Sequence, residues 1–490
     1  MTQRLHAVEN LAESVARPSY DRTALGAGIV HIGLGAFHKA HQAVYTDDAL
    51  AAAGGDWRII GVSLRSAVPA EELAPQEGLF TVIQRSEAGS KARVIGAIAM
   101  ALCLKTQRQD VLAALVAPET RIVSITVTEK GYGIDRSTGG IDRNHPAIAA
   151  DLANPEEPSG LAGLLVWALG HRRAAGIEPF TVLSCDNLPE NGPLVRGLLT
   201  DFARNAVPEL ADYITGNVAF PATMVDRITP ARSAATLDLA REMTGRQDEA
   251  AVECEDFHQW VIEDNFPTGR PAWEAGGAIF VDKVRPYEEM KLRMLNGAHS
   301  MLAYSGFLAG HKYVRDVMAD PDLAVLVHRH LLAAASTLDP LPGVDFRRYA
   351  LELESRFRNP HLGHETFQIA MDGTEKMPQR IFAPAADAVR KDLPLGPFAL
   401  ATASWMRYTL GCTDHGKPYA LRDPREEEIR QSNPAESAEE IATRLLGLSG
   451  FCPELLRENP EWMEKVISNL DQIMALGMET ALSRAAALQD

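Results

Sequence analysis

The chain has 490 residues, more than one typical domain needs, and its 46% hydrophobic and 23% charged residues are ordinary for a globular protein. The formal net charge of −17 argues against a nucleic-acid partner, because binding to phosphates favours a basic surface. The five scattered cysteines form no CxxC pair, which argues against a disulfide framework and a zinc site. We therefore expect a cytoplasmic location, and no membrane partner, since no apolar stretch of about 18 residues occurs.

The first half of the chain alternates short apolar runs with helical patterns. Between the first two runs, residues 36–53 predict a helix that ends before a Gly-Gly pair. Apolar runs bounded by Gly, Pro or Asn predict strands at 28–33, 58–64, 121–127, 180–184 and 278–281. Strands that alternate with helices indicate a mostly parallel sheet.

The pattern changes near Pro286, after which helical periodicity dominates. Helices are predicted over residues 322–338, 398–410, 437–448 and 460–488. The sequence therefore predicts a Rossmann-type α/β domain over residues 1–285 and an all-α domain over residues 286–490.

A glycine-rich turn follows the first predicted strand. Gly33 and Gly35 match the first two glycines of a dinucleotide-binding turn, and His38 stands at the third. This turn predicts cofactor contacts from the run Ile32–Phe37, namely Ile32, Gly33, Gly35, Ala36 and Phe37. The alternative is a turn that only packs a helix onto the strand.

The residues after the second predicted strand leave the choice of cofactor open. An acid there would bind the ribose 2′-hydroxyl of NAD, but this position holds Arg65, which suits the 2′-phosphate of NADP. Among His31, His38 and His41 no cysteine or nearby acid completes a metal site, so no metal is expected.

The strongest chemical signal is a helical segment that carries Glu288, Lys291, Asn296 and His299. At about 100° per residue these side chains share one broad face of an otherwise apolar helix. A lysine in such a setting loses hydration, so we expect its pKa to fall toward the working pH, which suits an acid/base group. The alternative is a surface helix with an ordinary Glu–Lys pair.

Polar residues also follow the predicted strands. Asn187 comes after residues 180–184, and Glu129 with Lys130 comes after residues 121–127, at the sheet edge where α/β domains bind ligands. Asp226 follows another apolar run. Each has a simpler alternative. Asn187 could merely form a turn, Glu129 and Lys130 could be solvated loop charges, and Asp226 could form a local ion pair with the arginine that follows it.

Two cations, Lys376 and Arg380, flank a turn in the second half. Arginine is suited to bidentate recognition of a carboxylate, whereas ordinary surface charge is the alternative.

Taken together, these segments resemble the mannitol dehydrogenase family, the polyol-specific long-chain dehydrogenases, over nearly the whole chain. The resemblance is carried by residues 33–42, 184–187 and 224–229 and by the spacing of Lys291, Asn296 and His299. It implies a metal-independent oxidoreductase with NAD as cofactor and with its site in the cleft between the two domains. Family members are often monomers, and the sequence leaves the oligomeric state open.

The resemblance also implies roles for the matching residues. Lys291 would be the acid/base, Asn187 and Asn296 the donors to the alkoxide, and His299 the group that positions substrate and lysine. Glu288 and Glu129 would relay protons, and Asp226 would lie on the cofactor or substrate side.

Within the family, several stretches are most similar to the members that reduce D-fructuronate to D-mannonate. These stretches are residues 126–132, 259–266, 368–380 and 405–408. A glycine tends to stand in the mannitol enzymes where this chain has Lys130. Lys130, Lys376 and Arg380 therefore predict a sugar-acid substrate. Tagaturonate and neutral pairs such as fructose and mannitol, or arabinitol, are the alternatives.

Overall fold

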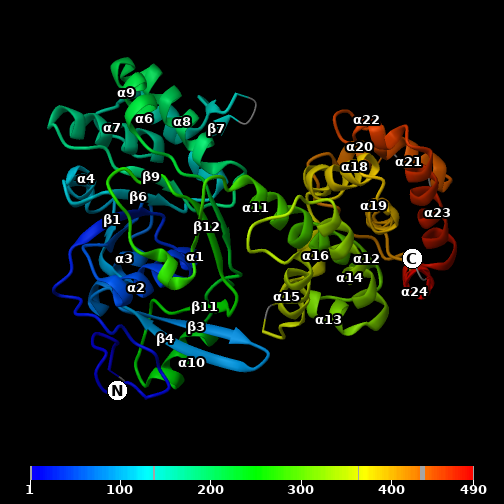
Figure 1. Cartoon of the computed structure of the whole chain (residues 1–490), viewed down its shortest axis with the longest axis horizontal. Helices are drawn as coiled ribbons and strands as arrows, with labels where there is room; N and C mark the ends of the chain where they lie inside the picture. Colours follow the sequence, from blue (N-terminus) through cyan, green and yellow to red (C-terminus); the bar gives the residue numbers. More distant parts are fainter. Residues whose placement is uncertain (1–2, 136–137, 362, 431–435, 489–490) are drawn as a thin grey trace. The chain divides into compact units, whose positions relative to one another are not determined.

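The computed structural model describes residues 3–135, 138–361, 363–430 and 436–488 (Figure 1). The chain divides into two compact units, Met1–Arg285 and Pro286–Asp490, called unit 1 and unit 2 below. Unit 1 combines sheets and helices, and unit 2 is helical in the residues described.

The centre of unit 1 is a five-stranded sheet in the order β5-β2-β1-β6-β9, in which every neighbouring pair is parallel. The strands are β1 (Ala27–Ile32), β2 (Arg58–Ser63), β5 (Ile98–Cys103), β6 (Ile122–Ile125) and β9 (Thr181–Ser184). The predicted Rossmann-type parallel sheet is therefore confirmed. The strand order reverses between β1 and β6, so the carboxyl ends of these two neighbouring strands mark the position where open α/β sheets bind ligands.

Alternate residues of β1 face two separate hydrophobic cores. Val30 and Ile32 belong to one core, and Ile29 belongs to the other. Because side chains of a strand alternate between faces, the sheet is covered by helices on both sides. The helices of unit 1 are α1 (Ala36–Ala40), α2 (Gln42–Ala53), α3 (Val68–Leu73), α4 (Arg108–Val116), α5 (Glu129–Tyr132), α6 (Pro146–Ala153), α7 (Leu161–Ala174), α8 (Asn191–Ala206), α9 (Ala211–Asn217) and α10 (Ala234–Thr244).

Three smaller sheets complete unit 1. They are β11-β3-β4, β10-β12-β13 and β7-β8. Their strands are β3 (Phe80–Ser86), β4 (Gly89–Ile95), β7 (Ile134–Asp135), β8 (Gly140–Ile141), β10 (Thr223–Asp226), β11 (Val252–Glu255), β12 (Gln259–Glu263) and β13 (Ile279–Val281). The strand predicted at 278–281 exists as β13, but it pairs with β12 instead of joining the central sheet.

The helix predicted over residues 36–53 is interrupted at His41. This residue leaves helical geometry, with φ −121° and ψ −92°, and separates α1 from α2. Its ring Nε2 lies 3.1 Å from the carbonyl oxygen of Gln259, a contact 218 residues away in sequence. Local periodicity cannot reveal such a break, because its cause is a tertiary contact.

Unit 2 is built around two buried helices, α12 (Gly297–Leu308) and α19 (Gly396–Thr409). Around them lie α11 (Arg285–Met290), α13 (Val314–Ala319), α14 (Pro321–Ser336), α15 (Phe346–Arg358), α16 (Thr366–Ala370), α17 (Gly373–Met377), α18 (Ala383–Arg390), α20 (Glu426–Ile429), α21 (Ala438–Leu446), α22 (Glu454–Arg457), α23 (Pro460–Leu476) and α24 (Met478–Ala487). The helix predicted over residues 460–488 is divided at Gly477, whose φ of +81° a glycine adopts easily.

Two segments of unit 2 form π-helical turns, η4 (Lys291–Asn296) and η5 (Pro378–Phe382). Such turns are rare in proteins, and those that do occur are often found at functional sites.

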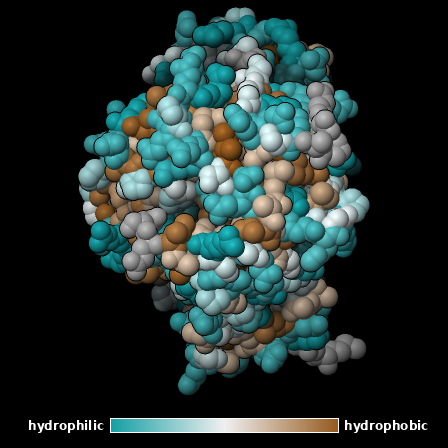
Figure 2. All heavy atoms as spheres, turned by 90° about the vertical axis from the view of Figure 1, so that its right-hand side faces the viewer, coloured by the Kyte–Doolittle hydropathy of each residue, from teal (hydrophilic) through white to brown (hydrophobic). Residues whose placement is uncertain are grey.

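The surface drawn in Figure 2 is mostly hydrophilic, with hydrophobic residues scattered among charged and polar ones. Within the described parts of the chain, none of the helices combines the length and the apolar character needed to cross a membrane.

Candidate functional site

The glycine turn lies at the carboxyl end of β1. Gly33 has φ +107°, and a Cβ added there would lie 2.0 Å from the carbonyl oxygen of Thr126, so only glycine fits this position. A Cβ added to Gly35 would meet nothing closer than 3.7 Å, which leaves its backbone open to a ligand. Both features are those that close approach of a dinucleotide pyrophosphate requires.

His38, which stands in place of the third glycine, is buried and stacks on His31 with ring centroids 3.4 Å apart. His31 contacts the Ser124 hydroxyl at 2.8 Å and the Thr126 hydroxyl at 2.9 Å. Burial lowers the pKa of His31 to about 3 and that of His38 well below its ordinary value, so both rings are neutral. The histidines pack the turn onto β1, and among the described residues no cluster suited to a metal ion occurs.

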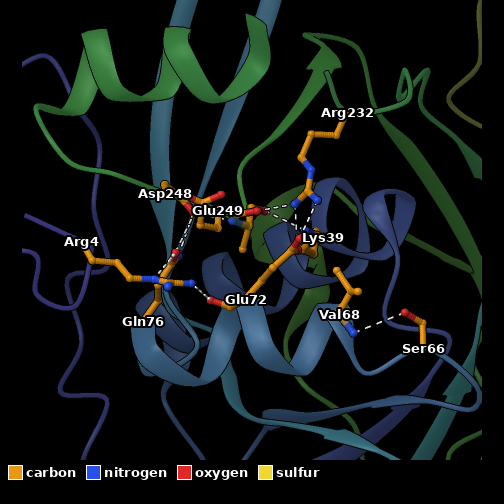
Figure 3. A network of polar contacts seen from close by, with 10 residues as sticks. Arg4, Lys39, Ser66, Val68, Glu72, Gln76, Arg232, Asp248 and Glu249 are labelled. Atoms are coloured by element: carbon orange, nitrogen blue, oxygen red, sulfur yellow. Dashed lines mark hydrogen bonds and ion pairs between the residues drawn. The ribbon is translucent and has the colours of Figure 1, made fainter. Parts of the chain in front are cut away.

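Lys39, the next residue of the motif, is buried and donates to the carbonyl oxygen of Ala250 at 2.7 Å. Figure 3 shows Lys39 within a polar network in which Arg232 pairs with Glu72 and Gln76 donates to Asp248. Burial lowers the pKa of Lys39 to about 8. This network joins α1 to the residues before β11, so Lys39 has a structural role.

Asp186 organises the carboxyl ends of β6 and β9. Its carboxylate accepts hydrogen bonds from the backbone N–H of Val127 at 2.9 Å and of Thr128 at 3.3 Å, and from the Tyr132 hydroxyl at 2.7 Å. Burial raises the pKa of Asp186, and these three donors oppose that rise. The two strand ends that the sequence singles out are thus tied together by one side chain.

The predicted polar residues at this edge are accessible. Glu129, Lys130 and Asn187 are all exposed. The Lys130 ammonium has no hydrogen-bond or ion-pair partner within the part of the chain that the structure describes. Arg65 is exposed just after the end of β2. The residues directly after this strand, Arg65 to Val68, include no acid that could bind the ribose 2′-hydroxyl of NAD.

The five cofactor contacts predicted from the turn lie together. Ile32 is buried at the end of β1, Gly33 and Gly35 form the turn, and Ala36 and Phe37 are half-buried at the start of α1. Asp226 is apart from the central sheet. It is buried at the end of β10 and pairs in register with Gln259.

Lys291 and Asn296 are the first and last residues of the π-helical turn η4. A π-helix bonds residue i to residue i+5, so it brings Asn296 nearer to the Lys291 face than 100° per residue predicts. The angular positions expected from regular α-helix are therefore wrong across this turn. Lys291 is 7% exposed, so a solvated Glu–Lys pair does not describe the segment, while Glu288 is half-buried one turn earlier in α11.

His299 and Arg380 lie beside this turn. The ring of His299 contacts that of Phe357, with centroids 4.7 Å apart, and its buried Nε2 finds no hydrogen-bond partner among the described residues. Burial, reinforced by the positive charges of Arg380, Arg356 and Lys291, lowers the pKa of His299 well below its ordinary value. Arg380 reaches the Asn296 carbonyl oxygen at 3.4 Å and the Ser300 hydroxyl at 3.3 Å.

Lys376 differs from Arg380. Its ammonium donates to the carbonyl oxygens of Ile369 at 3.2 Å and Met371 at 2.5 Å, and it lies 3.7 Å from the Asp372 carboxylate. Two hydrogen bonds and one ion pair thus engage the Lys376 ammonium and hold the turn before α17. A substrate role for Lys376 stays a prediction.

In unit 1 the predicted turn residues, Glu129, Lys130 and Asn187 lie at the carboxyl ends of β1, β6 and β9, while Asp226 lies on another sheet. In unit 2 Arg380 contacts the turn that carries Lys291 and Asn296, while Lys376 is engaged by its own turn. Sequence reasoning passed over Asp186 and Tyr132, although both stand inside the segments that it singled out. A carboxyl group directly after a buried strand, one residue before Asn187, is a signal that could have identified Asp186.

Comparison with known proteins agrees with this geometry. Residues 27–275 match the mannitol dehydrogenase Rossmann domain, and residues 283–474 match the mannitol dehydrogenase C-terminal domain. The chain belongs to the mannitol dehydrogenase family. It is therefore an oxidoreductase of a family whose members act on CH–OH groups.

Members of this family with different substrates are about equally similar to the chain. The D-mannonate oxidoreductase of Escherichia coli (strain K12) is 41% identical over 94% of this chain and 96% of that protein. The mannitol 2-dehydrogenase of Cereibacter sphaeroides is 40% identical over 97% and 99%. The structure of Pseudomonas fluorescens mannitol 2-dehydrogenase in a ternary complex with NAD and D-mannitol shares 38% identity, covers 99% of both chains and has a TM-score of 0.81.

Proposed function

We propose that this family member binds NAD at the glycine turn and reduces D-fructuronate to D-mannonate. The open backbone at Gly35 and the need for glycine at position 33 support the fit of a dinucleotide. The contacts predicted for the cofactor are Ile32, Gly33, Gly35, Ala36, Phe37, Arg65 and Asp226. Arg65 would also suit the 2′-phosphate of NADP, so NADP is the alternative cofactor.

When bound, NADH supplies the hydride that reduces the ketone carbon. Lys291 donates a proton to the oxygen on which negative charge develops, and it takes the proton back when the alcohol is oxidised. The amides of Asn187 and Asn296 donate hydrogen bonds to the same oxygen. The orphaned Nε2 of His299 supports its role in orienting a substrate hydroxyl or the lysine. Glu288 and Glu129 relay the proton to solvent.

A sugar acid is favoured over a neutral ketose by Lys130. This exposed ammonium stands at the carboxyl end of β6 with no partner among the described residues, so it is available to a substrate carboxylate. Arg380 adds a second cation, and its two long hydrogen bonds leave most of its five donors available.

The test is a substrate panel with both reduced cofactors. We expect kcat/KM for D-fructuronate with NADH to exceed that for D-fructose by more than about tenfold, which corresponds to about 1.4 kcal/mol. Equal or better rates with fructose would favour a mannitol 2-dehydrogenase, and a preference for D-tagaturonate would favour the corresponding reductase.

Substitution of Lys130 tests the carboxylate contact directly. Lys130→Gly should raise KM for fructuronate more than KM for fructose, because only the uronate carries a charge for the ammonium to bind. Lys105→Gly, which removes an exposed lysine elsewhere in unit 1, serves as the control. An equal effect of Lys130→Gly on both substrates would remove the argument for a carboxylate contact.

A further inference from the structure

The backbone of Thr128 has an unusual conformation. Its φ is +66° and its ψ is 157°, a region that is normally accessible only to glycine. Positive φ is least tolerable for a β-branched side chain, and among the described non-glycine residues with positive φ, Thr128 is the sole β-branched one. A strained backbone persists only where the surrounding structure holds it in place.

The restraint comes from both sides of Thr128. On the amino-terminal side, the Thr126 hydroxyl donates to the Gly33 carbonyl oxygen at 2.8 Å, which ties the segment to the glycine turn. On the other side, the Tyr132 hydroxyl contacts Ser184 at 2.8 Å and Asp186 at 2.7 Å. Asp186 also accepts the N–H of Thr128 itself. Residues 126–132, called the strand-end segment below, therefore have little freedom to relax.

The short helix α5, which carries Glu129 and Lys130, begins directly after Thr128 and is fixed at its other end as well. Gly133 has φ +68°, and a Cβ there would lie 2.7 Å from Ile148. The ring of His145 contacts the Lys130 carbonyl oxygen at 3.1 Å. The backbone of α5 is thus held on both sides, while the charged side chains of Glu129 and Lys130 point outward from it into exposed positions.

We propose that Thr128, through its strained backbone, and Asp186, through its three accepted hydrogen bonds, are positioning residues that fix the backbone from which the Lys130 side chain extends, and that selectivity for sugar acids depends on them. This inference rests on the proposed function. Its physical basis is that a long lysine side chain recognises a carboxylate more selectively when its backbone cannot rotate, because less freedom is lost on binding.

The test separates the backbone of Thr128 from its side chain. Thr128→Gly relieves the strain and frees the backbone, whereas Thr128→Ala keeps a Cβ and so keeps the strain, but removes the hydroxyl and the methyl group. We expect Thr128→Gly to lower the ratio of kcat/KM for fructuronate over fructose about tenfold without lowering Tm. Thr128→Ala should keep the wild-type ratio, whatever its effect on the overall rate.

Glu77→Gly is the matched control, because it places glycine at an exposed residue with φ +52° elsewhere in unit 1. It should leave the substrate ratio unchanged. Asp186→Asn should reproduce the loss seen with Thr128→Gly, since an amide offers a single acceptor oxygen where the carboxylate has two.

A second measurement does not depend on the substrate. Trypsin cleaves after exposed lysines that sit on mobile backbone, so Thr128→Gly and Asp186→Asn should both increase the rate of cleavage after Lys130, and Thr128→Ala should not. If the wild-type enzyme shows no preference for sugar acids, the proposed function fails, and the cleavage rates still decide whether these residues fix the segment. An unchanged ratio and an unchanged cleavage rate in Thr128→Gly would overturn the inference, as would equal effects of Thr128→Gly and Thr128→Ala.

Discussion

The strand-end segment of unit 1 and the lysine-bearing turn η4 of unit 2 are held by different physical means. In the first, side-chain hydrogen bonds to Asp186 maintain a backbone that would otherwise relax. In the second, a π-helical turn sets the spacing of Lys291 and Asn296 within a continuous helical run. The first arrangement depends on a few distant partners, and the second depends on backbone geometry that one side-chain substitution leaves in place.

This difference has consequences for the two kinds of substitution. Changes at η4 should remove chemistry and spare the fold, because the helical backbone continues on both sides. Loss of a hydrogen bond to the Asp186 carboxylate should alter the position of the strand-end segment, the substrate selectivity and the stability together. The following predictions test this contrast.

The largest effect is expected from Lys291→Ala. Loss of the acid/base group should lower kcat by about 10²- to 10⁴-fold, with cofactor binding and Tm little changed. The measurement is kcat across pH together with fluorescence titration of NADH, and Lys312→Ala, at an exposed lysine of the same unit, is the control. Near-normal rates at every pH would show that another group transfers the proton.

Asn296→Asp replaces an amide donor by a carboxylate of the same shape. Because a donor to the developing negative charge is lost, we expect kcat to fall by about 10²- to 10³-fold while KM changes much less. Steady-state kinetics with fructuronate would measure both. A rise in KM at unchanged kcat would instead mean that Asn296 contributes to ground-state binding alone.

Acid should destabilise unit 1 through its buried neutral histidines. Burial lowers the pKa of His31 and His41 to about 3, so between about 6.5 and 3 the unfolded chain binds more protons than the folded one. Stability is therefore lost as pH falls through this window, by about 2 kcal/mol for each histidine at pH 5. Urea unfolding at pH 7.5 and pH 5 measures the loss.

The variant His41→Gln should show a smaller difference between these two pH values than the wild type. His171→Gln, at an exposed histidine of the same unit, should not. A stability that is equal at pH 7.5 and pH 5 would mean that the buried rings accept protons without cost.

The smallest effect is expected from Tyr132→Phe, which removes one donor to Asp186. The lost hydrogen bond to a carboxylate should cost about 2 kcal/mol of stability. The hydroxyl of Tyr132 lowers the pKa of Asp186, so its removal should raise that pKa further and shift the acid limb of the pH–rate profile to higher pH. If the acid limb stays at the wild-type pH, protonation of Asp186 does not control the reaction rate.

Much of the fold follows from local pattern. Apolar runs bounded by glycine and proline correctly predict β1, β2, β6 and β9, because a strand buried on both faces must be apolar. The change to helical periodicity near Pro286 lies where the chain divides into its two compact units. By contrast, the sequence did not predict β3, β4 and β11. β3 and β4 form a local antiparallel hairpin, whereas β11 pairs with β3 from far along the chain, a partner that no local pattern reveals.

For the candidate site, residue types and spacing along the sequence single out Lys291, Asn296, His299 and Asn187, because these groups are rare together on an apolar background. Tertiary structure decided what surrounds them. No local pattern in the sequence predicts three of these features. They are the π-helical turn, the hydrogen bonds from Lys376 to the carbonyl oxygens of Ile369 and Met371, and the strained backbone of Thr128. The reason is physical: periodicity reports on neighbours within a turn or a strand, whereas the bond from Val127 to Asp186 joins residues 59 apart in the chain.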